Sequence, residues 1–314
     1  MSYVAVDIGA TNVRVASADK DGISRKLSEV TDRDNGAIGV SQQIVRMISS
    51  LGLYEISTIG VGSIGPVDLA SGIIVNTPNF PFERVPVVEP LNEAFDVPVR
   101  MLNDCAAAVL GEHTFGAGRG VDNLAYVTFS TGLGGGAIVD GHLLVGKDGN
   151  AVEIGHLTID PHSPLVCGCG CRGHWEAHSS GDNLPNFVRL YLREEDESSL
   201  ITELAGSDRD AITAEILFRA AQEGDPTALR IVSQLGEVNA IGVANVVNAF
   251  DPEVVTIGGS IALENPDLIL NPILENIDRH LINRRPEIMI TPLGSDAVLY
   301  GALALAISPP EIFV

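Results

Sequence analysis

Three of the chain's four cysteines and one histidine lie within a run of eight residues, CGCGCRGH, as Cys167, Cys169, Cys171 and His174. A second histidine, His156, precedes the run. Thiolate sulfur and imidazole nitrogen are the ligands that tetrahedral Zn²⁺ prefers, and a short loop that carries several of them gathers a coordination sphere. A zinc with four protein ligands is closed to substrate and stabilises structure. These residues therefore predict a structural Zn²⁺ site.

The same cysteines could instead be redox-active, or one pair could form a disulfide. The rest of the chain offers only Cys105, and its first residues do not predict a secretory signal, so a disulfide framework is not expected. Cys-x-Cys pairs also close tight rings that strain disulfide geometry. Glu153 and Glu176 bracket the cluster, so the metal is expected to hold acids in place, whereas His162 and His178 are expected to be solvated.

Glycine turns at predicted strand ends could bind phosphate. There is no GxxxxGK[ST] motif, but residues 7–11 (DIGAT) and 130–136 (STGLGGG) can each direct backbone N–H groups at a phosphate tail. Asp7 would bind the water shell of Mg²⁺, which contacts phosphates with few protein ligands. Gly258 and Gly259 could approach adenine or ribose closely. A structural hairpin explains any one such turn, so the repetition of the pattern is what favours nucleotide binding.

Asp104 follows Asn103 where a predicted strand, 97–102, meets a predicted helix, 105–112. Two interpretations stay open from the residues alone. Asp104 could be the N-cap of the helix, or it could be a general base that takes the proton from an attacking hydroxyl.

The elements that must position these residues show an internal repeat. Residues 3–7 and 13–18 predict two strands around the turn at Gly9, and residues 126–141 repeat the pattern with Tyr3 aligned on Tyr126 and Asp7 on Ser130. Such a duplication implies two similar domains that face each other. Apolar periodicity predicts helices over 37–51, 224–250 and 298–307 and buried strands over 56–62 and 254–257.

The length of 314 residues corresponds to about two domains. Because 45% of residues are hydrophobic and only 5% aromatic, the core of this α/β protein must consist of Val, Ile, Leu and Ala. We predict a hinge at the glycine-rich residues 116–120. The predicted domains are a small N-terminal α/β domain, 1–118 plus 295–314, and a larger C-terminal α/β domain, 119–294, which carries the zinc loop.

The formal net charge of −22 comes from 41 acidic against 19 basic residues. Such a field repels nucleic acid and anionic membranes, so neither is an expected partner. An excess of acid with few lysines is typical of proteins that work in concentrated salt, where screening shortens to about 3 Å near 1 M. The composition therefore predicts a halophilic protein, which we expect to be cytoplasmic.

The motifs together resemble those of the ROK family of sugar kinases, and within it the glucokinases. They are DIGATN at 7–12, ND at 103–104, STGLGGG at 130–136, EIGH at 153–156, CGCGCRGHWE at 167–176 and GG at 258–259. The resemblance covers nearly the whole chain in order. It implies an actin/hexokinase-like (ribonuclease H-like) fold of two duplicated domains with a cleft between them, and ATP-dependent phosphorylation of the 6-hydroxyl of glucose.

The resemblance also implies a role for each matching residue. Asp104 would be the base that acts on the 6-hydroxyl. The sugar pocket would consist of Gly65, Asn79, Asn103, Asp104, Glu153, His156 and Glu176. The nucleotide site, for ATP with transiently bound Mg²⁺, would consist of Asp7, Gly9, Thr11, Asn12, Thr131, Gly132 and Gly259.

One departure from the family's usual CxCGxxGCxE run affects the zinc ligands. His174 occupies the third cysteine position, and Cys171 is an additional cysteine inside the run. The resemblance implies that His156, Cys167, Cys169 and His174 bind zinc, with Cys171 as the competitor of His174.

Other functions fit the same motifs. A kinase for N-acetylmannosamine, N-acetylglucosamine or another hexose shares the pocket residues, and ADP or polyphosphate could replace ATP as donor. A sugar-sensing regulator without turnover is a rival from another class, although Asp104 beside Asn103 argues against it. Some family members are repressors with an N-terminal DNA-binding segment, which the acidic charge makes improbable here. The family resemblance also implies a homo-oligomer, a dimer or a tetramer.

Overall fold

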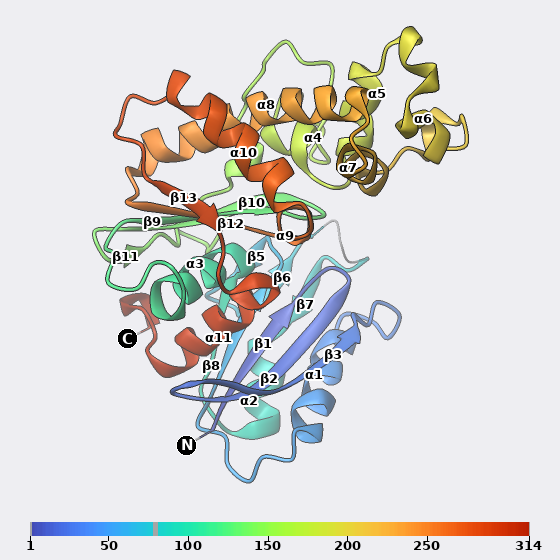
Figure 1. The fold of residues 1–314 in the computed structure, drawn as a ribbon. Coiled ribbons are helices and arrows are strands. Elements are labelled where there is room, and N and C mark those ends of the chain that lie inside the picture. The colour runs from blue at the N-terminus through green and yellow to red at the C-terminus, as the bar shows by residue number, and fades with distance from the viewer. Residues whose placement is uncertain (1, 78–80, 314) are drawn as a thin grey trace. The chain divides into compact units, whose positions relative to one another are not determined.

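The computed structural model describes residues 2–77 and 81–313 as a mixed α/β protein (Figure 1). The chain forms two compact units. The first unit comprises Met1–Tyr126, Gly136–Val152 and Thr291–Val314, and the second comprises Val127–Gly135 and Glu153–Ile290. This division groups 119–126 and 136–152 with the N-terminal part of the chain; the domain limits 1–118 plus 295–314 and 119–294 stay a prediction.

The first unit is built on a five-stranded sheet with the order β3-β2-β1-β4-β8. Its strands are β1 Tyr3–Ile8, β2 Asn12–Asp19, β3 Gly22–Val30, β4 Thr58–Ser63 and β8 Val99–Asn103. Strand β1 runs antiparallel to β2 and parallel to β4, which in turn is parallel to β8. Parallel strands bring their carboxyl ends to one edge of the sheet, so the residues after β1, β4 and β8 gather there.

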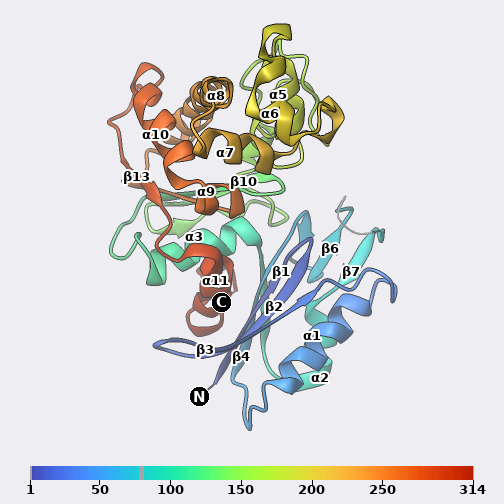
Figure 2. The same cartoon turned by 45° about the vertical axis from the view of Figure 1, so that its right-hand side comes forward.

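Side chains of β1 alternate between two buried faces, as the period of two in a strand requires. Val4, Val6 and Ile8 pack against α1 (Gly39–Ser50) and α2 (Val88–Phe95), whereas Ala5 packs against α11 (Ala297–Ile307). Figure 2 shows α1 and α2 on one face of the sheet and α11 on the other. A strand buried on both faces explains the continuous apolar run at the start of the sequence.

Small residues bring α3 (Asp104–Phe115) and α11 into close contact. A Cβ atom at Gly301 of α11 would overlap the carbonyl oxygen of Ala107 in α3, and one at Gly60 of β4 would overlap that of Ala302. These contacts confirm that the small residues of the two predicted helices permit close packing. The end of the chain thereby packs on β1, where the chain begins.

A second five-stranded sheet has the order β11-β10-β9-β12-β13. Its strands are β9 Leu124–Phe129, β10 Leu133–Val139, β11 His142–Leu143, β12 Val254–Gly258 and β13 Glu287–Ile290. In both sheets the three strands that come first along the chain lie in reverse order from one edge, as β3-β2-β1 and as β11-β10-β9. Two later strands that are parallel to each other complete each sheet, β4-β8 and β12-β13. This identical order confirms the duplicated architecture.

The register of the predicted repeat needs a correction. Strands β1 and β9 have six residues each, and three residues separate each of them from the next strand. Tyr3 therefore corresponds to Leu124, two residues before the predicted Tyr126. A shift of two preserves which side chains face each way, so the apolar pattern could not distinguish the registers.

The remaining elements complete the two units. The first unit also has a small antiparallel sheet of β5 Val67–Asp68, β6 Ile73–Val75 and β7 Arg84–Pro86. The second unit has the helices α4 Trp175–Ser179, α5 Leu184–Tyr191, α6 Leu200–Leu204, α7 Ala214–Gln222, α8 Pro226–Phe250, α9 Ser260–Glu264 and α10 Pro266–Asn276. The 3₁₀ helices are Ile154–His156, Glu194–Ser198, Arg209–Ala211, Ile277–Arg279, Gly294–Asp296 and Glu311–Phe313. Among the described helices, none combines the length and apolarity that crossing a membrane requires.

Candidate functional site

The structure brings four of the predicted metal ligands together in the second unit. One ligand atom from each of His156, Cys167, Cys169 and His174 lies within 4.8 Å of every other. Cys167 Sγ is 3.6 Å from His156 Nδ1, and Cys169 Sγ is 3.4 Å from His174 Nδ1. A tetrahedral Zn²⁺ with ordinary bond lengths places sulfur and nitrogen ligands about 3.5 Å apart. Two thiols and two imidazoles at these distances fit zinc in both chemistry and spacing.

The backbone of the loop explains why these residues meet. The amide N–H of Cys167 donates to the carbonyl of Cys171 at 2.8 Å, which closes a tight turn around Gly170. Gly170 has a φ of 86°, in the left-handed region that glycine adopts most easily. His174 pairs with Thr158 in an isolated β-bridge, which returns it to the segment that follows His156. Local turn geometry therefore brings the four side chains together.

Cys167 and His174 differ in their protonation. Burial raises the pKa of the Cys167 thiol to about 12, so this sulfur is protonated at neutral pH without a metal. Desolvation and the neighbouring His156 lower the pKa of His174, which keeps its imidazole neutral and able to bind metal. A bound divalent cation would displace the thiol proton and turn the sulfur into a thiolate ligand.

The alternative ligands lie differently. Cys171 is exposed and does not belong to the group of four mutually close ligand atoms. His162 is exposed, as expected. The expectation that His178 is solvated is wrong: it is 3% exposed, and its Nδ1 lies 2.8 Å from the carbonyl oxygen of His174. His178 lies one helical turn after His174, on the buried side of α4. The spacing of the histidines in the sequence did not indicate this burial.

Glu176 connects the cysteine cluster to the glycine turn at 130–132. The Cys167 thiol donates to Glu176 Oε1 at 3.2 Å, and the amide N–H of Leu133 donates to Oε2 at 3.2 Å. A Cβ atom at Gly132 would also lie 3.2 Å from Oε2. One carboxylate thus fixes the start of β10 and contacts a predicted metal ligand.

Trp175 anchors the helix that carries Glu176. Its indole is fully buried, meets Phe129 edge-on at 5.7 Å between ring centres, and donates from Nε1 to Asn239 Oδ1 at 2.9 Å. Ser179 donates to the same oxygen at 2.6 Å. A Cβ atom at Gly242 of α8 would overlap the ring, so only glycine leaves room for it there. Asn239 and Gly242 therefore position Glu176 through Trp175. Because both lie far from Glu176 along the sequence, the sequence did not predict this role.

Glu153 directly precedes the 3₁₀ helix Ile154–His156, and His156 is the last residue of that helix. Desolvation raises the pKa of the Glu153 carboxyl, the nearby His156 lowers it and the Glu176 carboxylate raises it. The three predicted sugar-pocket residues of the second unit thus interact electrostatically. Two carboxyls and an imidazole near one another provide both donors and acceptors for hydroxyl groups.

Asp104 is the first residue of α3, directly after β8. The N-cap role proposed for it belongs to Asn103, whose side chain accepts from the amide N–H of Cys105 at 2.9 Å. Asp104 Oδ1 accepts from the same N–H at 2.8 Å. The capping interpretation of Asp104 is therefore wrong, and its carboxylate is fixed at the edge of the sheet where β4 and β8 end.

Gly65 lies next to Asn103 at this edge. A Cβ atom at Gly65 would lie 2.8 Å from Asn103 Nδ2 and 3.6 Å from Asn150 Oδ1. Asn150, which the sequence did not reveal as part of this region, accepts from Val67 N and donates to Val67 O at 2.8 and 2.7 Å. The predicted residue Asn79 lies outside the described residues. Gly65, Asn103 and Asp104 are therefore the described residues of the predicted sugar pocket in the first unit.

Asp7 is buried and forms an ion pair with Arg14, its cross-strand neighbour on β2. Arg14 also donates to Ser295 O at 2.7 Å, and Lys26 contacts Asp296 at 2.7 Å. Burial raises the pKa of the Asp7 carboxyl, and the Arg14 guanidinium opposes this shift. Arg14 was not predicted, although the hairpin places these opposite charges face to face. The Arg14 guanidinium thus holds in place the Asp7 carboxylate, which is predicted to contact hydrated Mg²⁺.

The predicted nucleotide residues lie on turns in the two units. Gly9, Thr11 and Asn12 follow β1, and the N–H of Gly9 donates to Asn12 O at 2.9 Å, so this one amide is used within the turn. Thr131 and Gly132 follow β9. Gly259 follows β12 with a φ of 87°, and a Cβ atom there would overlap the carbonyl of Phe129. Glycine at 259 is therefore required by both backbone conformation and space.

Comparisons with known proteins extend along the whole chain. The profile of the ROK family matches residues 3–308. A glucokinase of Pyrobaculum calidifontis is 41% identical over 309 residues, which cover 98% of this chain and 96% of that relative. A glucokinase of Thermotoga maritima is 35% identical over 311 residues, 97% of each chain.

A solved structure gives the same result. The ROK family glucokinase from Streptomyces griseus, determined in complex with glucose and AMPPNP, matches with a TM-score of 0.82 at 29% identity. The match covers 98% of this chain and 99% of that one. The chain is therefore similar to glucokinases in both sequence and fold.

Proposed function

The chain belongs to the ROK family, and from this premise we propose that it is an ATP-dependent glucokinase that phosphorylates the 6-hydroxyl of glucose. The observation that carries the proposal is Asp104, a carboxylate fixed at the start of α3 beside the capping Asn103, in a chain similar to glucokinases along its length. A regulator without turnover would not need that carboxylate.

In the proposed mechanism Asp104 takes the proton from the 6-hydroxyl as that oxygen attacks the γ-phosphorus of ATP. Phosphoryl transfer requires alignment and charge stabilisation more than covalent chemistry. The sugar is held by Gly65, Asn79, Asn103, Glu153, His156 and Glu176. The turns at 9–12 and 131–132 and Gly259 bind the nucleotide. Mg²⁺ would neutralise charge on its phosphates, and Asp7 would accept hydrogen bonds from the water shell of the ion.

Zinc has a structural role in this proposal. His156, Cys167, Cys169 and His174 hold it, and their spacing supports that assignment. With all four positions filled by protein the ion does not reach substrate. By binding the ion, these four residues would hold in place the loop that leads to Glu176, and an ordered loop would strengthen binding of the sugar.

A coupled assay of ADP release tests the proposal. Glucose with Mg–ATP is expected to give turnover, and N-acetylmannosamine, N-acetylglucosamine, mannose and fructose form the comparison panel. Replacing ATP by ADP or polyphosphate identifies the donor. Turnover of an amino sugar but not glucose would reassign the substrate, and no turnover with any pair would favour the sugar-sensing regulator. Light scattering on the same sample tests the proposed dimer or tetramer.

Adaptation to salt is a separate proposal that rests on charge. Nine ion pairs in the described part of the chain engage eight of the 41 acidic residues, and the pairs leave the net charge of −22 unchanged. We expect the melting temperature to rise steeply from low to molar KCl, because screening weakens repulsion between carboxylates. Sucrose at equal osmolality is the control for solute exclusion. A melting temperature indifferent to KCl would contradict halophilic adaptation.

A further inference from the structure

The segment after β3 satisfies every carbonyl group of the turn at Gly9–Thr11. Thr31 donates from its hydroxyl to Gly9 O at 2.8 Å and from its amide to Thr11 O at 2.9 Å. Arg33 donates from Nη2 to Ala10 O, between them. Thr31 is buried, so its two bonds are shielded from water. The turn cannot easily offer these oxygens to a ligand.

The groups of this turn that stay available to a ligand are hydrogen-bond donors. Among the described residues, the amide N–H groups of Ala10 and Thr11 have no hydrogen-bond partner. Successive free N–H groups on a turn form a concave site for an anion. Carbonyl oxygens would repel that anion, and here all three are already engaged.

The corresponding turn of the second unit has the same arrangement. Ser130 O, Thr131 O and Gly132 O accept from backbone amides at 2.8, 3.2 and 3.0 Å, respectively those of Gly181, Asp182 and Ser130. Neutral groups occupy the carbonyls there. The first turn differs because a guanidinium occupies its middle carbonyl, so a cation lies beside this turn.

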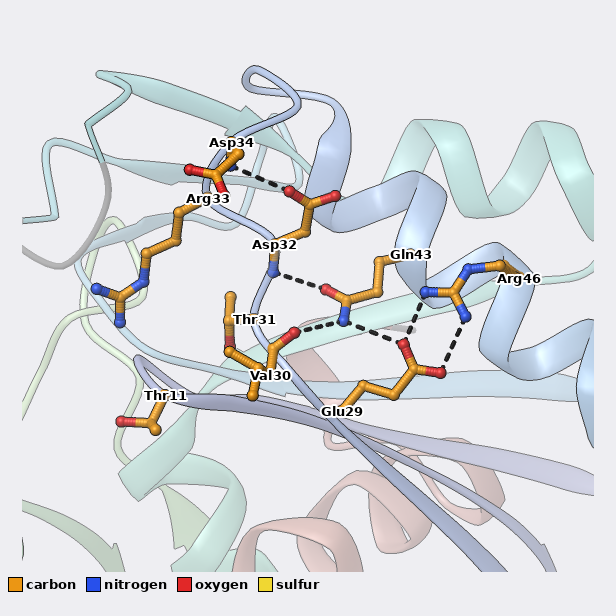
Figure 3. A pocket seen from close by; sticks show the side chains of 9 residues that line it. All are labelled: Thr11, Glu29, Val30, Thr31, Asp32, Arg33, Asp34, Gln43 and Arg46. Atoms are coloured by element: carbon orange, nitrogen blue, oxygen red, sulfur yellow. Dashed lines mark hydrogen bonds and ion pairs between the residues drawn. The ribbon is translucent and has the colours of Figure 1, made fainter.

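Arg33 is also the unpaired cation of a hollow of about 640 Å³ (Figure 3), which is lined by Thr11, Glu29, Val30, Thr31, Asp32, Arg33, Asp34, Gln43 and Arg46. Arg46 forms a fork with both oxygens of Glu29 at 2.9 and 2.7 Å. Arg33 has no carboxylate partner in the part of the chain that is described. Figure 3 shows its guanidinium turned away from the cluster of Gln43, Glu29 and Arg46.

We propose that Arg33 contacts the phosphate tail of the nucleotide at the first turn, and that Thr31 positions this turn so that it presents donors only. The inference rests on the proposed kinase function and adds two residues to its nucleotide site. A guanidinium binds phosphate oxygens through two parallel N–H bonds. In a chain of charge −22, a local cation is also needed to offset the long-range repulsion of a polyphosphate.

The test compares Arg33→Gln with Arg46→Gln, which removes the other arginine of the same hollow. Binding of Mg–ADP without sugar is measured by calorimetry at fixed KCl, with the KM values for ATP and glucose. Because hydrogen bonds to charged groups contribute about 1.5–3 kcal/mol, Arg33→Gln should weaken Mg–ADP about 10- to 100-fold and raise the KM for ATP. The KM for glucose and the Kd for AMP should stay near wild type, and Arg33→Lys should recover part of the loss.

Several outcomes would overturn the inference. These are Mg–ADP binding by Arg33→Gln equal to wild type, an equal loss in Arg46→Gln, or an equal loss of AMP binding. If the wild-type protein phosphorylates glucose while Arg33→Gln binds Mg–ADP normally, only the inference fails. If the wild-type protein neither binds Mg–ADP nor turns over, the proposed function fails with it.

Discussion

Replacing Asp104 by asparagine is expected to lower kcat about 10²- to 10⁴-fold, which is the usual effect of removing a general base. Asparagine keeps the side-chain oxygen that accepts from the amide of Cys105, and Asn103 still caps α3. The melting temperature and the Kd for glucose should therefore remain near wild type. Steady-state kinetics and calorimetry with glucose measure the two effects separately.

Asp267→Asn is the matched control for this substitution. Asp267 is likewise an acid in the first turn of a helix, α10, but it is exposed and lies in no proposed site. Its loss should change kcat little. Near-normal turnover in Asp104→Asn would show that Asp104 is not the general base, and would require another group in that role.

Replacing His174 by alanine is expected to reduce bound zinc from about one ion per chain to nearly none, because the site loses one of its four ligands. Affinity for glucose should fall with it, since the loop that leads to Glu176 loses its anchor. Cys171→Ser, at an exposed sulfur outside the group of four, should retain both metal and sugar affinity. Elemental analysis and glucose calorimetry on both variants measure these effects.

The opposite pattern would identify Cys171 as the fourth ligand. Zinc retained at full occupancy in both variants would mean that neither side chain is required, and the proposed ligand set would then be incorrect. Loss of zinc without any change in glucose affinity would separate the metal from the sugar site and contradict the structural role given to it.

The fold was largely predictable because its central strands β1, β4, β9 and β12 are buried on both faces, and the first strand of each sheet ends in a turn that contains glycine. The runs at Tyr3–Ile8 and Leu124–Phe129 carry that signal twice. The sequence therefore revealed that the chain contains a repeat. It did not reveal the register of the repeat, because a two-residue shift leaves every side chain on the same face. Helix limits differed by only a few residues, as at α1, where apolar spacing says little about the end of a helix.

The site was predictable where residues adjacent in sequence act together. The cysteine loop is of this kind, since backbone turns within 156–174 assemble it. Arg33 and Asn239 act on turns and helices distant in sequence, at Ala10 and Trp175, so their roles required the fold. His178 was misjudged because burial depends on the neighbours of α4, which a loop motif does not reveal.

Trp175 is the only tryptophan of the chain and lies between His174 and Glu176. Its indole is sealed against Phe129, Gly242 and Asn239, with no exposed surface. Intrinsic fluorescence excited at the indole band therefore has a single origin, one residue from a proposed metal ligand and one from a proposed sugar ligand. Titrations with zinc or glucose can be followed by emission from the unlabelled protein, and any red shift reports water reaching this one place.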